Sequence, residues 1–99
     1  MYGNPQKRMH SDVQELRRDG GRWLKNQREA VGLSQRQLAQ LVGAEYYTFI
    51  SQLEAGRGRV PPDRYHEWSR ALEMSPKAFV TKMLQFYDPM TYNILFEEE

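Results

Sequence analysis

The chain has 99 residues, of which 39% are hydrophobic and 27% are charged, with a formal net charge of +1. This length suits one domain with a modest core, and the absence of cysteine excludes disulfides, thiol nucleophiles and cysteine-rich zinc sites. The sequence holds no apolar run of membrane-spanning length and its first ten residues are polar, so we expect a cytoplasmic protein without a membrane partner.

The positive charge lies in the body of the chain and the negative charge at its end. Residues 1–75 carry twelve Lys and Arg side chains against nine Asp and Glu, whereas residues 76–99 carry two against four. Residues 1–10 contain Gly3, Asn4 and Pro5 beside Lys7 and Arg8. They are predicted to form a flexible basic arm.

A long first helix is expected to begin at Ser11, because Ser11 and Gln14 have the spacing of a capping box. Its apolar positions follow helical spacing at Val13, Leu16, Gly20, Trp23, Leu24 and Val31. Gly20 and Gly21 form a soft spot in its middle, and Gly32 is a natural stop.

Two short helices joined by a tight turn follow. Ser34 and Gln37 form a second capping box, and the helix that they open has Leu38, Leu41 and Val42 as its core stripe and ends at Gly43. A third helix has Tyr46, Phe49, Ile50 and Leu53 as its core stripe and ends at Gly56. This pairing predicts a helix-turn-helix formed by the second and third helices.

Two more helices and a tail complete the prediction. Pro62 suits the first turn of a fourth helix, and Ser75 followed by Pro76 starts a fifth, which Asp88-Pro89 breaks after Tyr87. Residues 11–87 are thus predicted to form one all-α, five-helix domain. The tail, residues 88–99, alternates apolar and polar side chains and is expected to be short and extended. It either packs on its own domain or contacts a second copy or another protein.

The outward side of the third helix is rich in hydrogen-bonding groups. With its core stripe turned inward, four side chains point out: Tyr47, Thr48, Ser51 and Gln52. An ordinary solvated helix face carries Lys and Glu, and neither occurs between Tyr46 and Leu53. Polar, uncharged side chains of this kind reach base edges in a major groove, so we expect these four to read DNA bases.

The groups expected to hold DNA phosphates surround that face. Free backbone amides at a helix start attract anions, and guanidiniums pair with phosphates. The predicted phosphate contacts are Ser34, Gln35, Arg36, Arg57 and Arg59. Phosphate contacts fix register and supply most of the salt-dependent affinity, while base contacts carry sequence information.

Arg28 is predicted to form an internal ion pair. It lies between Leu24 and Val31 on the apolar face of the first helix, and a buried guanidinium without a partner is very costly. Glu54, at the end of the third helix, is the nearest carboxylate in this topology. The pair is expected to tie the first helix to the recognition helix.

The sequence offers no catalytic site, metal site or cofactor site. His10 and His66 lie far apart without ligand spacing, and Ser34 and Ser75 are explained as helix caps. We therefore expect a protein that is not an enzyme and that carries no metal or cofactor.

Together these residues resemble the xenobiotic-response-element family of helix-turn-helix regulators, the lambdoid phage repressor and Cro type. The matching run is Arg28-x-x-x-Gly32-Leu33-Ser34-Gln35, Leu38-Ala39, Gly43 and Ile50-Ser51-x-x-Glu54-x-Gly56-Arg57. The resemblance extends from about Gly21 to Leu84. It implies a bacterial or phage regulator of transcription, commonly a repressor, that binds double-stranded DNA as a two-fold homodimer on a palindromic operator. It also implies that Gln35 bridges a phosphate and begins base contacts.

Two questions stay open at this level. Counting back from Glu54 puts the N-cap of the third helix at Tyr46, whereas counting forward from Ser34 puts it at Glu45, so the turn or the helix start is one residue longer than the family's usual pattern. The alternative function is the antitoxin half of a toxin–antitoxin pair, which uses the same DNA-binding fold and adds a partner-binding segment such as residues 88–99.

Overall fold

The computed structural model describes the backbone of residues 5–97 and the side chains of residues 13–97. Over this range the chain is all-α, with no strand. The elements are α1 (Pro5–Val31), α2 (Gln35–Val42), α3 (Tyr47–Glu54), the 3₁₀ turn η1 (Pro62–Arg64), α4 (Tyr65–Ala71), α5 (Pro76–Tyr87) and α6 (Pro89–Phe96). The second and third helices, which the sequence assigned to the helix-turn-helix, are α2 and α3.

Helix α1 begins earlier than the sequence suggested. It starts at Pro5 and runs without interruption to Val31, so Ser11 lies inside the helix and does not cap it. Proline suits the first helical position, because its missing N–H has no partner there and its φ is already helical. The prediction of a flexible arm is therefore wrong for Pro5–His10, while residues 1–4 lie outside the described part.

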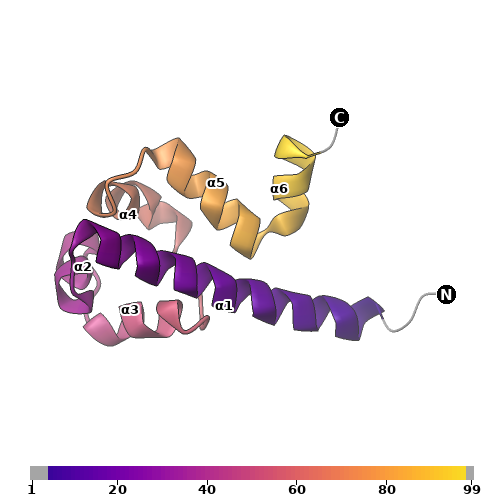
Figure 1. Cartoon of the computed structure of the whole chain (residues 1–99), viewed down its shortest axis with the longest axis horizontal. Helices are drawn as coiled ribbons and strands as arrows, with labels where there is room; N and C mark the ends of the chain where they lie inside the picture. The colour runs from indigo at the N-terminus through magenta and orange to yellow at the C-terminus, as the bar shows by residue number, and fades with distance from the viewer. Residues whose placement is uncertain (1–4, 98–99) are drawn as a thin grey trace.

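The core forms where α1 lies between two groups of helices. In Figure 1, α3 runs along one side of α1, and α4 and α5 lie on the other side. Helix α2 packs on both α3 and α4 and closes one end of the bundle. The buried apolar side chains are Leu24, Leu38, Ala39, Val42, Ile50, Leu53, Val60, Trp68, Leu72, Phe79 and Met83.

The glycine pair of α1 is a crossing point, not a soft spot. Gly20 and Gly21 are both buried within a continuous helix. A Cβ at Gly21 would overlap the carbonyl oxygens of Glu54 and Leu53, and a Cβ at Gly20 would lie 2.9 Å from the Cβ of Phe86. The missing side chains let α1 touch the end of α3 and the side of α5 at once.

Three apolar residues expected in the core lie at the surface. Leu41 is 55% exposed, Val13 is 43% exposed and Tyr46 is 66% exposed. Helix α2 packs on α3 and α4, and Leu38, Ala39 and Val42 already fill the arc that faces them. Leu41 lies just outside that arc, so its helical spacing did not make it a core residue.

The tail is a sixth helix, which corrects both the extended prediction and the helix count. Asp88 caps α6: its Oδ1 accepts from the Thr91 N–H at 3.2 Å, and its Oδ2 accepts from the Thr91 hydroxyl at 2.7 Å. These hydrogen bonds lower the pKa of the Asp88 carboxyl. Asp88-Pro89 therefore ends α5 and also starts α6, because proline is favoured at the first position of a helix.

Helix α6 adds little to the core. It packs on α5, none of its residues is buried, and it exposes large apolar side chains. These are Met90, Ile94, Leu95 and Phe96.

Candidate nucleic-acid interface

The four side chains predicted to read bases lie together on the outer face of α3. Ile50 and Leu53 turn inward and are fully buried, which fixes the rotation of the helix about its axis. On the opposite side the side chains are all exposed: Tyr47, Thr48, Ser51 and Gln52. The amphipathic pattern of the sequence and the packing of the helix thus give the same outward face.

This face is free to bind something else. Within the described residues, the side chains of Thr48, Ser51 and Gln52 make no hydrogen bond and no ion pair. The Arg36 guanidinium of α2 lies over the ring of Tyr47, with its Cζ 4.6 Å from the ring centroid. Arg36, expected to bind phosphate, is thus held beside the first of the predicted base readers.

Helix α3 begins at Tyr47, with Tyr46 as its N-cap. The backbone of Tyr46 is extended (φ −130°, ψ 138°), and the Phe49 N–H donates to its carbonyl oxygen at 3.1 Å. The N-cap thus agrees with the count made back from Glu54. Residues 43–46 form the turn, in which Gly43 has a left-handed backbone with φ 71°. The Tyr46 side chain caps nothing and points to the surface, contrary to the core position expected for it.

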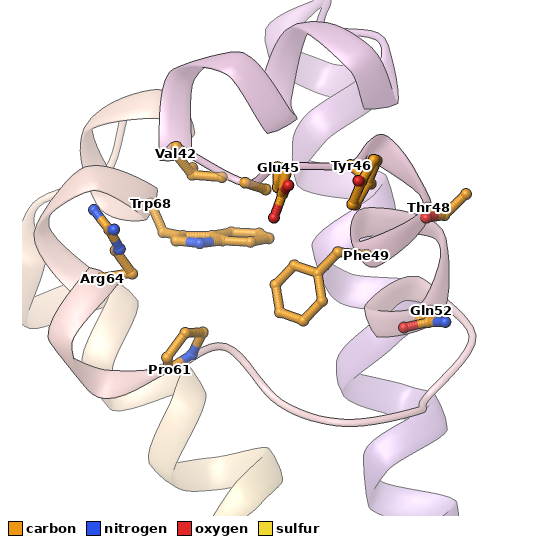
Figure 2. Close-up of a pocket in the computed structure, with 11 residues that line it drawn as sticks. Val42, Glu45, Tyr46, Thr48, Phe49, Gln52, Pro61, Arg64 and Trp68 are labelled. Atoms are coloured by element: carbon orange, nitrogen blue, oxygen red, sulfur yellow. The ribbon is translucent and has the colours of Figure 1, made fainter.

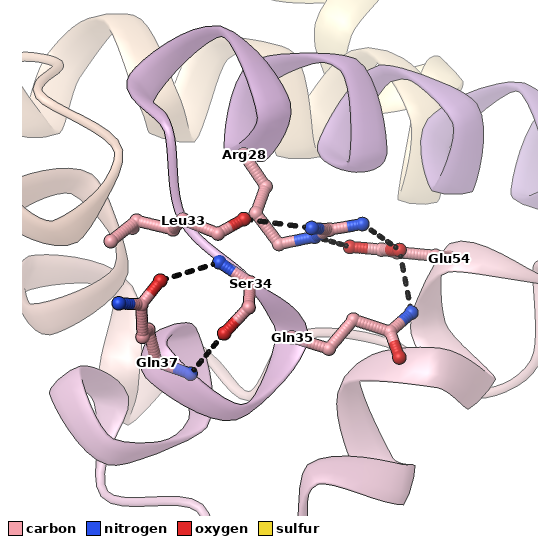
Figure 3. A network of polar contacts seen from close by, with 6 residues as sticks. All are labelled: Arg28, Leu33, Ser34, Gln35, Gln37 and Glu54. Carbon is pink, nitrogen blue, oxygen red and sulfur yellow. Dashed lines mark hydrogen bonds and ion pairs between the residues drawn. The ribbon is translucent and has the colours of Figure 1, made fainter.

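The structure brings Arg28 and Glu54 into a buried ion pair (Figure 3). Arg28 Nε donates to Glu54 Oε2 at 2.6 Å and Arg28 Nη2 donates to Glu54 Oε1 at 3.0 Å, while Nη1 donates to the Leu33 carbonyl at 2.8 Å. The hydrogen-bonded carboxylate raises the pKa of Arg28 against the opposing effect of burial. The pair joins α1, the loop before α2 and the end of α3.

The start of α2 is attached to the same network. Gln35 Nε2 donates to Glu54 Oε1 at 3.0 Å, which orients the amide of a residue expected to touch phosphate and bases. Ser34 and Gln37 form the capping box predicted from their spacing (Figure 3). The Ser34 hydroxyl accepts from the Gln37 N–H at 3.0 Å, and the Ser34 N–H donates to Gln37 Oε1 at 2.8 Å.

The remaining predicted phosphate contacts lie on the loop after α3. Arg57 and Arg59 are exposed, and no carboxylate among the described residues lies within ion-pair distance of either. The Arg57 N–H donates to the Gln52 carbonyl at 2.8 Å, which keeps the loop close to the end of α3. The Arg59 guanidinium lies over the ring of Tyr87, 5.0 Å from its centroid.

A cavity of about 370 Å³ opens beside the predicted readers (Figure 2). Phe49, Trp68 and Pro61 form its apolar walls, and Thr48 and Gln52 stand along one side. Glu45 also lines the cavity, so the turn places a negative charge next to the outward face of α3. Thr48 and Gln52 therefore border both an apolar hollow and this carboxylate.

Two residues near this surface were not singled out by sequence reasoning. Arg17 of α1 and Tyr87 of α5 contact the loop after α3: Arg17 Nη1 donates to the Gly58 carbonyl at 3.3 Å, and the Val60 N–H donates to the Tyr87 hydroxyl at 3.3 Å. A signal for Arg17 existed, because it lies four residues before Gly21 on the helix face that carries Leu24 and Arg28. Tyr87 carries no such signal, because the sequence marks it only as the last residue before the Asp88-Pro89 break.

The described residues hold neither a metal-binding cluster nor a membrane-spanning helix. No group of three or more His, Asp or Glu side chains in that part of the chain is arranged to hold a metal ion. In the same part, no helix combines the length and apolarity needed to cross a bilayer.

The fold and this surface define a helix-turn-helix protein of the DNA-binding class. A family model described as helix-turn-helix matches residues 24–79, which is more than half of the chain. The chain therefore belongs to the XRE-type helix-turn-helix family, the lambda repressor and Cro-like regulators of transcription. Members of this family are DNA-binding regulators and not normally enzymes. No curated protein matches the chain.

Proposed function

We propose that this protein is a sequence-specific transcriptional regulator that inserts α3 into the major groove of its operator. The observation that carries the proposal is the outer face of α3, where Thr48, Ser51 and Gln52 are exposed and unengaged while Ile50 and Leu53 anchor the helix in the core. Such side chains donate to and accept from base edges, whose pattern in the major groove distinguishes all four base pairs.

Flanking groups are proposed to hold the DNA backbone. The N-terminus of α2, with Ser34 and Gln35, presents backbone amides to one strand, and Arg36 lies next to them on the same helix. Arg57 and Arg59 follow α3 directly and would bind phosphates at its other end. The regulator would act in the cytoplasm, where its DNA is found.

The protein is proposed to bind as a homodimer on a palindromic operator. One α3 of eight residues reads only a few base pairs, so a second copy doubles the recognised sequence and raises the specificity. The family commonly forms such dimers.

Selection of bound fragments from random DNA, followed by substitution of one reader, tests base recognition. Gln52→Ala is expected to cost about 1–3 kcal/mol at the selected site and to relax the preference at one or two base positions. Affinity for scrambled DNA is expected to stay unchanged, as measured by fluorescence anisotropy at fixed salt.

Lys77→Ala is the matched control, because Lys77 is exposed in the first turn of α5. Helix α5 lies on the other side of α1 from α3 (Figure 1). The control variant should leave both affinities unchanged. If Gln52→Ala lowers the affinity for selected and scrambled DNA equally, Gln52 does not read bases.

The second candidate function is that of an antitoxin with the same DNA-binding domain. The feature that favours it is α6, whose apolar side chains Met90, Ile94 and Leu95 are exposed to solvent at the end of the described chain. Purification of the tagged protein from its native host distinguishes the two functions. A small toxin recovered in stoichiometric amount supports the antitoxin, whereas recovery of the protein without one supports the regulator.

A further inference from the structure

Three segments that are distant in the sequence meet at the ring of Tyr87. Arg17 from α1 places its Cζ 5.3 Å from the ring centroid, and Arg59 from the loop after α3 places its Cζ 5.0 Å from it. The Tyr87 hydroxyl accepts the Val60 N–H of the same loop. Burial raises the pKa of this hydroxyl, so it stays protonated and the ring stays neutral at physiological pH.

The two guanidiniums at this ring lack a neutralising partner. No carboxylate in the described part of the chain lies within ion-pair distance of Arg17 or Arg59. Arg17 uses Nη1 on the Gly58 carbonyl, while its Nε is buried and makes no hydrogen bond. A buried donor without an acceptor is unfavourable, so the Arg17 guanidinium is not fully satisfied by its contacts within the protein.

Asp88 is the acidic group nearest to this site in the sequence, and it is already engaged. The positive charge of Arg59 contributes to the lowered pKa of Asp88, which places the two within electrostatic range. The Asp88 carboxylate, however, accepts two hydrogen bonds from Thr91 as the cap of α6. Two guanidiniums thus lie near one carboxylate, which leaves the site with a net positive charge next to one aromatic ring.

The geometry points to an anion site: we propose that Arg17 and Arg59, oriented by the ring of Tyr87, bind a phosphodiester of the DNA backbone. This inference rests on the proposed function, because the loop that carries Arg59 directly follows α3. A phosphate beside the end of α3 is where a strand bordering the occupied groove would pass. Stacking on Tyr87 holds both planar guanidiniums in place before binding, which lowers the ordering cost of a phosphate contact.

The salt dependence of DNA binding tests the role of Arg17. Each neutralised phosphate adds about 0.9 to the slope of log K against log salt for double-stranded DNA. Arg17→Gln is expected to reduce the magnitude of this slope by about 0.9, the contribution of one phosphate. It should also weaken binding to selected and scrambled DNA by the same factor. Arg22→Gln is the control, because Arg22 is an exposed arginine of the same helix already paired with Asp19, and its slope should equal that of the native protein.

Two substitutions of Tyr87 test the positioning role. Tyr87→Phe keeps the ring and should keep the native slope, whereas Tyr87→Leu removes the ring and should reproduce the loss seen with Arg17→Gln. Far-UV circular dichroism checks that each variant is folded. If Tyr87→Leu does not fold, Arg17→Gln alone still decides the proposal.

The outcomes separate this inference from the function on which it rests. If the native protein shows no sequence-preferring DNA binding, the proposed function fails. If the native protein binds DNA selectively and Arg17→Gln leaves the slope unchanged, only the phosphate site is overturned. Inorganic phosphate, titrated by NMR, distinguishes the source of the anion: saturation of the site at micromolar phosphate would indicate a free-anion site and overturn the assignment to the DNA backbone.

Discussion

Glu54 accepts hydrogen bonds from two other helices near the proposed interface. Its two carboxylate oxygens accept from Arg28 of α1 and from Gln35 of α2, although Glu54 itself ends α3. One buried carboxylate thus joins the three helices that carry the proposed DNA-binding surface. The guanidinium and the carboxylate are both nearly inaccessible to water, at 8% and 5% side-chain exposure, so neither tolerates loss of the other.

Glu54→Ala is expected to destabilise the fold by about 3–5 kcal/mol, because it leaves the Arg28 guanidinium buried without an anion. Urea denaturation followed by circular dichroism measures the change. Glu15→Gln, at an exposed position of α1 away from Arg28, should change the midpoint little. The double variant R28M/E54L should recover most of the loss, since it removes both charges together, and a double variant as unstable as Glu54→Ala would contradict the ion-pair explanation.

For individual residues, the sequence predicted the outward face of α3 but not the partners of the arginines around it. Thr48, Ser51 and Gln52 follow from one amphipathic period on a short helix, so their outward orientation is readable from spacing. The partners of Arg36 and Arg59 were not readable, because each guanidinium lies on a tyrosine of another element. Long flexible side chains reach whatever the fold brings near them, and residue order does not specify that neighbour.

At the scale of elements, the crossing of α1 over the end of α3 depends on Gly21. The carbonyl oxygens of Leu53 and Glu54 occupy the space that a side chain at this position would need. These are backbone atoms of the recognition helix and cannot rotate away as a side chain could. A change at Gly21 is therefore transmitted directly to the end of α3.

Gly21→Ala is expected to lower the melting temperature, although alanine by itself favours a helix over glycine by about 1 kcal/mol. The overlap with the Glu54 carbonyl must push α1 and α3 apart, which costs core packing and strains the Arg28–Glu54 pair. Differential scanning calorimetry measures the shift. A higher melting temperature would mean that helix propensity outweighs the overlap. Helix α1 would then not lie as close to the end of α3 as the structure places it.

Helices α5 and α6 show how one dipeptide serves two elements. Asp88-Pro89 terminates α5 because proline cannot continue a helix, and it starts α6 because aspartate caps and proline fits the first turn. When Asp88-Pro89 is interpreted only as a helix break, the prediction is a five-helix domain with an extended tail. Reading Asp88 together with Thr91 three residues later would have indicated the sixth helix.

At the scale of the whole molecule, α1 sets the overall shape. Its C-terminal half forms part of the core, while its N-terminal half extends past α3 and α5 and away from the bundle (Figure 1). The outer face of α3 lies on one side of this long helix, and α6 lies near the opposite side. A second copy that covered α6 would therefore leave the outer face of α3 exposed.

The spacing of the operator half-sites tests the proposed dimer. Half-sites one helical turn apart, about 34–36 Å, present the same face of the DNA to both copies of α3. Insertion of five base pairs between them turns one half-site to the far side, so affinity should fall to that of a single half-site. Insertion of a full turn should restore part of the affinity, and binding insensitive to spacing would show that the protein reads DNA as a monomer.

The sequence by itself determined the local features: the ends of α2 and α5, the outward face of α3 and the pairing of Arg28 with Glu54. Caps, glycine stops and the helical period act over three or four residues, and a buried charge demands a partner in any fold. The tertiary structure alone decided the rest. Arg17, Arg59 and Tyr87 meet only because α1, the loop after α3 and α5 pack together. In the same way, an eight-residue segment such as α6 is too short to hold a helix on its own and takes that form against α5.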